Sequence, residues 1–174
     1  MPRISMQAVV SAVQKVRAMD TQEKMSLADE ISLKQPNMLS VVLTLRQLGV
    51  SLEKMSFAFE ILFICFQAMK ESGLNWPIIT EDEQEKQLER FAAIATFGED
   101  LSASLAHLAM KQYVESHPEQ PLFAFVSVEQ KDWLERASAE ESDKLVVLSI
   151  MTLVNCIAFV SLPKATTRAR RKAQ

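Results

Sequence analysis

Apolar and polar positions alternate with helical spacing along nearly the whole chain, and residues 51–72 (SLEKMSFAFEILFICFQAMKES) are the most one-sided example. Five polar side chains fall on one narrow stripe, namely Glu53, Ser56, Glu60, Gln67 and Glu71, and almost all other residues are apolar. A helix that is apolar over most of its circumference is buried in a core or lies in a membrane. Glu60 in the middle of the run argues against a lipid span. We therefore predict a central core helix over 51–72, with Ser51 as its N-cap and Gly73 at its C-terminal end.

A second strongly apolar stretch, residues 145–162 (LVVLSIMTLVNCIAFVSL), contains no charged residue. This is the shortest length at which a membrane span can be argued. Its small and polar residues gather on one side, however, which is typical of a helix packed along another helix. We expect residues 140–162 to form the buried centre together with 51–72, and a C-terminal membrane anchor over 145–162 is the alternative.

Shorter amphipathic helices are predicted around these two, bounded by Pro, Gly and capping residues. They cover residues 4–19, 20–35, 38–48, 80–97, 101–115 and 127–137. Capping boxes are expected at 80–83, 127–130 and 138–141, and residues 122–126 (LFAFV) are interpreted as an apolar connector on the core. Within the helix 101–115, we expect the inward positions to be Leu101, Leu105, Leu108 and Ala109.

The fold class that follows is all-α: a single-domain antiparallel helical bundle of about eight helices over 1–162, with a basic tail at 163–174. Residues 23–31 (EKMSLADEI) and 53–61 (EKMSFAFEI) agree at seven of nine positions, but no third copy is present in the sequence. Because helical repeat arrays need at least three repeats, we interpret this similarity as two helices with similar N-terminal sequences and not as a repeat array.

The two cysteines, Cys65 and Cys156, lie inside the most apolar helices. We expect buried free thiols in a reducing, cytoplasmic setting. Residues 1–19 lack acidic side chains, so an N-terminal targeting segment is an alternative for that stretch.

The sequence offers little catalytic chemistry. Three glycines leave no room for a phosphate-binding loop, and the zinc-protease, Cys-x-x-Cys and nucleophile-elbow motifs are absent. His107 and His117 are expected to be a boundary residue and a helix-closing residue, and the carboxylates of 81–89 to cap and solvate a helix. We therefore expect a non-enzymatic protein without a cofactor or a metal ion.

Charge is distributed unevenly along the chain. Residues 81–143 carry fifteen acidic and five basic side chains, whereas the tail after Leu162 is purely basic. Its cations are candidate nucleic-acid contacts through phosphate, namely Lys164, Arg168, Arg170, Arg171 and Lys172.

The leading functional hypothesis is a protein–protein interaction module: an adaptor, regulator or assembly subunit that binds another protein or itself, most simply as a homo-oligomer. Phe63 and Ile64 flank the polar stripe around Glu60, and Trp76 precedes Pro77 in an apolar linker, so these four residues are the candidate partner surface. Nine methionines also suit an adaptable surface. The alternatives are nucleic-acid binding through the tail and membrane attachment through 145–162.

Overall fold

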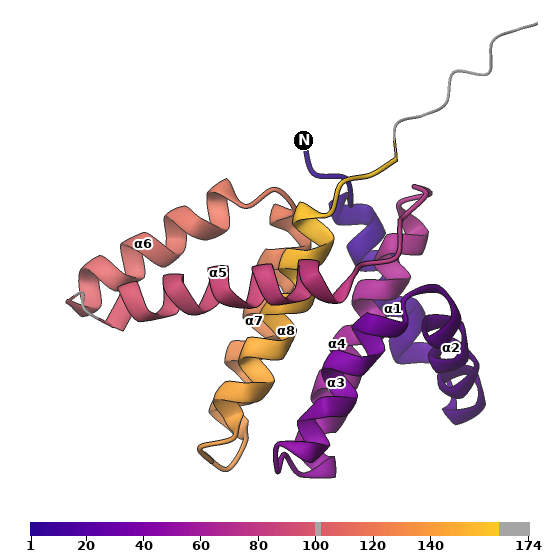
Figure 1. Ribbon diagram of the computed structural model, residues 1–174, viewed down its shortest axis with the longest axis horizontal. Helices are drawn as coiled ribbons and strands as arrows, with labels where there is room; N and C mark the ends of the chain where they lie inside the picture. Colours follow the sequence, from indigo (N-terminus) through magenta and orange to yellow (C-terminus); the bar gives the residue numbers. More distant parts are fainter. Residues whose placement is uncertain (100–101, 164–174) are drawn as a thin grey trace, which may run out of the picture.

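The protein is described by a computed structural model that covers residues 1–99 and 102–163, with side chains described except at 95–99. The described residues form eight α-helices and no strand, packed into one body (Figure 1). This confirms the all-helical prediction. The helices are α1 (Met6–Ala18), α2 (Thr21–Lys34), α3 (Pro36–Gln47), α4 (Leu52–Glu71), α5 (Glu81–Glu99), α6 (Ala103–Ser116), α7 (Gln120–Arg136) and α8 (Asp143–Phe159).

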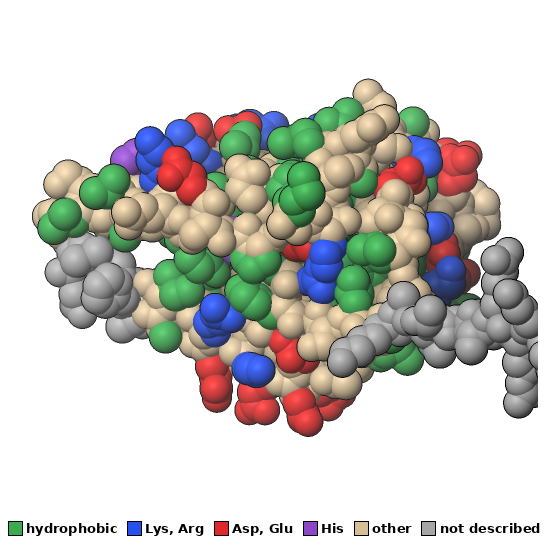
Figure 2. Space-filling model, turned by 90° about the horizontal axis from the view of Figure 1, so that it is seen from above, with side chains coloured by type: hydrophobic (Ala, Val, Ile, Leu, Met, Phe, Trp, Pro, Cys, Tyr) green, Lys and Arg blue, Asp and Glu red, His purple; other side chains and the backbone are tan. Residues whose placement is uncertain are grey.

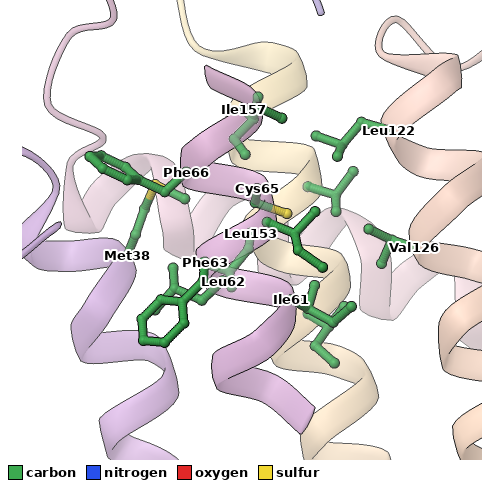
Figure 3. Close-up of a cluster of buried hydrophobic side chains, with 14 of the residues drawn as sticks. Met38, Ile61, Leu62, Phe63, Cys65, Phe66, Leu122, Val126, Leu153 and Ile157 are labelled. Carbon is green, nitrogen blue, oxygen red and sulfur yellow. The ribbon is translucent and has the colours of Figure 1, made fainter. Parts of the chain in front are cut away.

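Helices α4 and α8 form the centre, as the sequence predicts. They pack against each other, and side chains such as Ile61, Cys65 and Leu153 lie in the layer around them (Figure 3). All three of these side chains are fully buried. Helix α4 begins as expected, because the Ser51 hydroxyl accepts the backbone N–H of Lys54 at 3.3 Å. It ends before Gly73, whose φ of 68° favours glycine.

The first three helices cover α4, with α1 packed along it and α3 bridging α4 and α8. Helix α2 starts with a full capping box between Asp20 and Glu23. The repeated segment therefore occupies two different settings: Lys24 on α2 is exposed, whereas its counterpart Lys54 on α4 is buried.

Several expected boundaries are wrong. Residues 122–126 are not a connector but the first turns of α7, which carries Pro121 in its opening turn, where the missing N–H costs nothing. The capping box expected at 127–130 consequently falls inside that helix. Helix α3 begins at Pro36, two residues before the expected Met38, and Gly98 lies within α5.

Helix α8 begins at Asp143 and not at 140, because a buried ion pair fixes its first turn. The Asp143 carboxylate accepts the backbone N–H of Glu140 at 3.0 Å and pairs with the Lys54 ammonium, which also donates to the Ser138 carbonyl at 2.8 Å. Burial opposes ionisation of Asp143, but the contact with Lys54 outweighs it and lowers the pKa of that carboxyl. The pair thus joins the start of α4 to the start of α8.

Helix α5 runs across the C-terminal half of α8, and α6 returns beside its far end, so that α5 and α6 project from the body as a hairpin (Figure 1). The Arg90 guanidinium lies 3.9 Å from the centre of the Phe159 ring, which is one of the contacts that hold α5 on α8.

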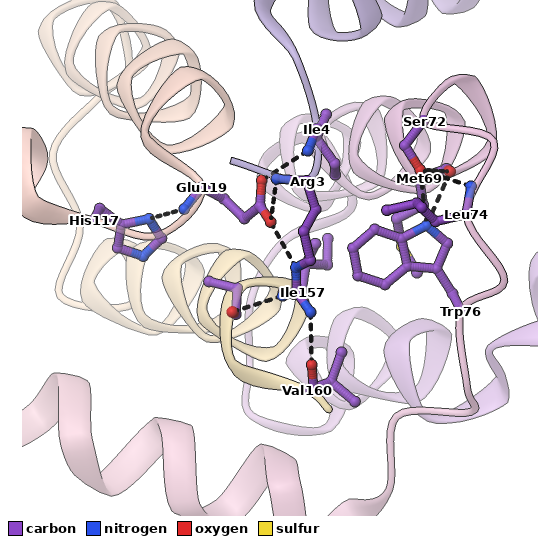
Figure 4. A network of polar contacts seen from close by, with 11 residues as sticks. Arg3, Ile4, Met69, Ser72, Leu74, Trp76, His117, Glu119, Ile157 and Val160 are labelled. Atoms are coloured by element: carbon purple, nitrogen blue, oxygen red, sulfur yellow. Dashed lines mark hydrogen bonds and ion pairs between the residues drawn. The ribbon is translucent and has the colours of Figure 1, made fainter. Parts of the chain in front are cut away.

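The N-terminal segment is fastened to the C-terminal end of α8 by a network around Glu119 (Figure 4). The Glu119 carboxylate is 1% exposed and accepts Arg3 Nε at 2.8 Å and the Ile4 backbone N–H at 2.9 Å. Arg3 in turn donates to the carbonyls of Ile157, Ala158 and Val160, so a cation caps the C-terminal end of α8. One ion pair therefore joins the segment before α1, the start of α7 and the end of α8.

Both cysteines are buried and unpaired, as expected. Burial raises the pKa of each thiol to about 12, so both stay protonated. In the described part of the chain, no helix combines the length and the apolarity that crossing a bilayer requires.

Replacing Glu119 with Gln should lower the free energy of unfolding by about 3 kcal/mol, because it leaves the Arg3 cation facing a neutral amide in a buried setting. Urea denaturation measures the change. The matched control is Glu135→Gln, which alters an exposed acid that lies 3.9 Å from Lys131 and should change stability by less than about 0.5 kcal/mol. Equal, small losses in both variants would contradict a structural role for the pair.

Candidate interaction surfaces

Helix α6 carries an apolar surface that the rest of the described chain leaves uncovered. Leu105, Leu108 and Met110 are 53%, 52% and 47% exposed, and α6 has no buried residue along its whole length. Leu105 and Leu108 lie on one side of the helix, and we call these two side chains the α6 surface; Met110, five residues after Leu105, lies on the other side. Figure 2 shows apolar side chains exposed at the left-hand end of the molecule, which the α5–α6 hairpin occupies.

The α6 surface is exposed because α6 is anchored mainly through its C-terminal end. The Tyr113 ring packs edge-on against Phe123 of α7 at 5.3 Å, and its hydroxyl donates to Asn155 of α8 at 3.4 Å. His117, just after the helix, stacks on Phe123 at 4.3 Å. The turns before Tyr113 extend away from these contacts along α5.

The α6 surface is also nearly free of charge. Lys111 and Glu115 are the only charged residues of α6, and they face each other across one helical turn at 3.9 Å. This local neutrality contrasts with the acidic composition of residues 81–143 as a whole.

The expectation that Leu105 and Leu108 face the core is therefore wrong, while Ala109 is partly buried and Leu101 lies outside the described residues. The spacing that predicts an amphipathic helix is present in the sequence. It cannot reveal that the apolar side has no neighbour within the same chain.

Two residues of the predicted partner surface are buried. Ile64 is fully buried and Phe63 is 9% exposed, because α4 is covered on more sides than its polar stripe suggests (Figure 3). Glu60 is accessible but engaged: it accepts Arg17 Nε at 3.1 Å, and Arg17 also binds Glu129 of α7 at 2.7 Å. This trio joins α1, α4 and α7.

Trp76 is half-buried, and its indole N–H donates to the Met69 carbonyl and the Ser72 hydroxyl, both at 3.0 Å (Figure 4). It borders a shallow groove of about 400 Å³ beside the C-terminal ends of α2 and α4. The exposed side chains of that groove include Leu33, Leu74 and Ile78. Of the four predicted residues, Trp76 is thus the one that borders an apolar groove.

His117 lies among the polar contacts that anchor α6, whereas the sequence predicts only a helix-closing side chain there. Its Nδ1 accepts the backbone N–H of Glu119 at 3.2 Å, so the neutral ring carries its proton on Nε2, which faces the Asn155 side-chain oxygen at 3.1 Å. Burial lowers the pKa of His117. The imidazole is therefore a neutral structural group at pH 7.

The described residues contain no group of three or more His, Cys, Asp or Glu side chains arranged to hold a metal ion. The candidate nucleic-acid contacts of the tail, 164–172, lie outside the described residues, so that hypothesis stays a prediction. Known proteins add no constraint, since no family model, curated protein or solved structure matches this chain.

The free energy of unfolding should fall as pH decreases below about 6.5, because the unfolded state then binds a proton that folded His117 resists. The slope from this group is at most about 1.4 kcal/mol per pH unit, between the unfolded pKa and the lower folded one. Urea denaturation from pH 7.5 to pH 5 should show a shallower fall for His117→Gln. The control, His107→Gln, changes an exposed histidine and should retain the wild-type slope. A His117 variant with the wild-type slope would contradict the assignment.

Proposed function

We propose that the protein is a non-enzymatic helical interaction protein that self-associates through the α6 surface. The observation that carries the proposal is that α6 exposes two leucines on one side and buries no residue. Covering two half-exposed leucines contributes about 2 kcal/mol per copy. Exposed apolar patches of this kind mark interaction sites in folded proteins.

The charges permit a second copy of the same chain as the partner at this surface. The chain has a net charge of −3 and the tail holds five cations, so residues 1–163 carry −8. Two such bodies repel each other over most of their surfaces. The α6 surface is apolar, and the one charged pair of its helix is neutral overall, so two copies can meet there without placing like charges opposite each other. A two-fold arrangement would place the same residues on both sides of the interface.

Self-association through α6 leaves the opposite end of the molecule free, including the groove beside Trp76. This arrangement suits an assembly subunit or adaptor, which must hold a copy of itself and present further surfaces at the same time.

Light scattering on the full-length protein tests the proposal, and we expect a dimer at about 50 µM that dissociates on dilution. The double variant Leu105→Glu/Leu108→Glu should be monomeric at that concentration, because dimerisation would then bury acids against acids. Both side chains are exposed, so the variant should keep the helical circular dichroism spectrum of the wild type.

The matched control is Leu52→Glu, which places an acid on an exposed leucine in the first turn of α4, where the helix dipole favours it. It should remain dimeric. A wild-type protein that is monomeric up to about 500 µM, or a dimer that survives the double substitution, would overturn the proposal.

A further inference from the structure

A second apolar surface lies in a groove between α3, α5 and α8, away from the α6 surface. Helices α8 and α3 diverge below α5, which crosses α8 (Figure 1). The groove between them has a volume of about 450 Å³. Its apolar lining comes from all three helices: Val41 of α3 and Leu48 directly after it, Leu88 of α5, and Leu145 and Leu148 of α8.

The floor of the groove is one side of α8, the more apolar of the two central helices. The residues that line it are Leu145, Leu148, Ser149 and Thr152, with the spacing i, i+3, i+4, i+7. Leu145 and Leu148 are only partly covered, and across the groove Leu48 and Leu88 are 54% and 38% exposed. A core helix is thus left open along about two turns, a length of about 10 Å.

Two of the hydroxyls that line the groove already have hydrogen-bond partners within their own helices, whereas the side-chain nitrogen of Gln84, another lining residue, is buried without a partner. The Thr152 hydroxyl donates to the Leu148 carbonyl at 2.8 Å, and the Thr44 hydroxyl donates to the Ser40 carbonyl at 2.8 Å. Both hydroxyls are therefore satisfied within their own helices, and the floor presents apolar surface to an occupant.

The rim on the α5 side is acidic. Glu81 and Glu85 line the groove and are exposed, and neither has an ion-pair partner among the described residues. Asp82 and Glu89 of the same helix are exposed as well. Acidic side chains gather along the lower edge of Figure 2, the side on which α5 faces the viewer in Figure 1. An occupant of the groove therefore meets negative charge along one flank.

We infer that this groove binds an amphipathic, basic helix of a partner protein. Such a helix places large apolar side chains at i, i+3, i+4 and i+7 on the leucine floor, and Lys or Arg on the adjacent flank meets Glu81 and Glu85. The chain's own tail fits less well: it has the cations, but its aliphatic residues after Pro163 are Ala165, Ala169 and Ala173, which are too small to fill the floor.

The probe is a fluorescein-labelled peptide of about 18 residues made of Leu and Lys, with leucines at the amphipathic helical spacing. Fluorescence anisotropy with the full-length protein should give a dissociation constant in the micromolar range. A peptide of the same composition in scrambled order has the same charge without the apolar face, and it should bind at least tenfold more weakly.

Two variants of the protein locate the binding. Glu81→Lys/Glu85→Lys should weaken binding at least tenfold, whereas Asp29→Lys/Glu53→Lys, which changes the net charge equally at exposed helical positions outside the groove, should weaken it less than threefold. Leu48→Ser/Leu88→Ser should also weaken binding at least tenfold, because it removes exposed apolar lining without charge.

Three results would each overturn the inference: equal binding of the ordered and scrambled peptides, equal weakening by the two charge variants, or no binding at about 200 µM protein. Light scattering on the same groove variants should still show the dimer, because the α6 surface is unchanged. A failure here is therefore distinguishable from a failure of the self-association proposal.

Discussion

The structure depends on the burial of one carboxylate, Glu119, against the Arg3 guanidinium. The pair brings the N-terminal segment, the start of α7 and the last carbonyls of α8 to one point. These three segments lie far apart in the sequence, and each has backbone groups that would otherwise lack partners in a partly buried place. A buried ion pair is a poor source of net stability but a strong constraint on arrangement, because few other packings satisfy both charges. The Lys54–Asp143 pair plays the corresponding role where α4 and α8 begin.

With both ends of α8 fixed in this way, the apolar surface of the protein divides into a covered part and an uncovered part. The covered part is the core around α4 and α8. The uncovered part includes the α6 surface, the groove between α3, α5 and α8, and the groove beside Trp76. These regions differ in charge: the first is neutral, and the second has an acidic rim. Different partners are therefore expected at each, which is the arrangement that an assembly protein requires.

Much of the fold can be predicted from the sequence, because helical spacing, N-caps and glycines at helix C-termini are local signals. The caps at Ser51 and Asp20 and the turn at Gly73 are examples. The interaction surfaces are harder to predict, because the exposure of a side chain depends on which helices pack beside it in the fold. Ile64 and Leu108 are both apolar residues at helical spacing, yet one is fully buried and the other is half exposed. No local pattern distinguishes them. The Arg3–Glu119 pair joins residues 116 positions apart, so it too has no local signature.

The attachment of α6 through Tyr113 and His117 has a mechanical consequence. Because α6 contacts the body mainly near its C-terminal end, a small change of its angle there moves its N-terminal end by several ångströms. The core around α4 and α8 is not disturbed by such a movement. Little buried apolar contact resists such a movement, and segments of this kind open locally at low free-energy cost. A partner that binds the leucines of α6, as proposed, would therefore set the orientation of α6, and with it the shape of the complex, as much as the chain itself does.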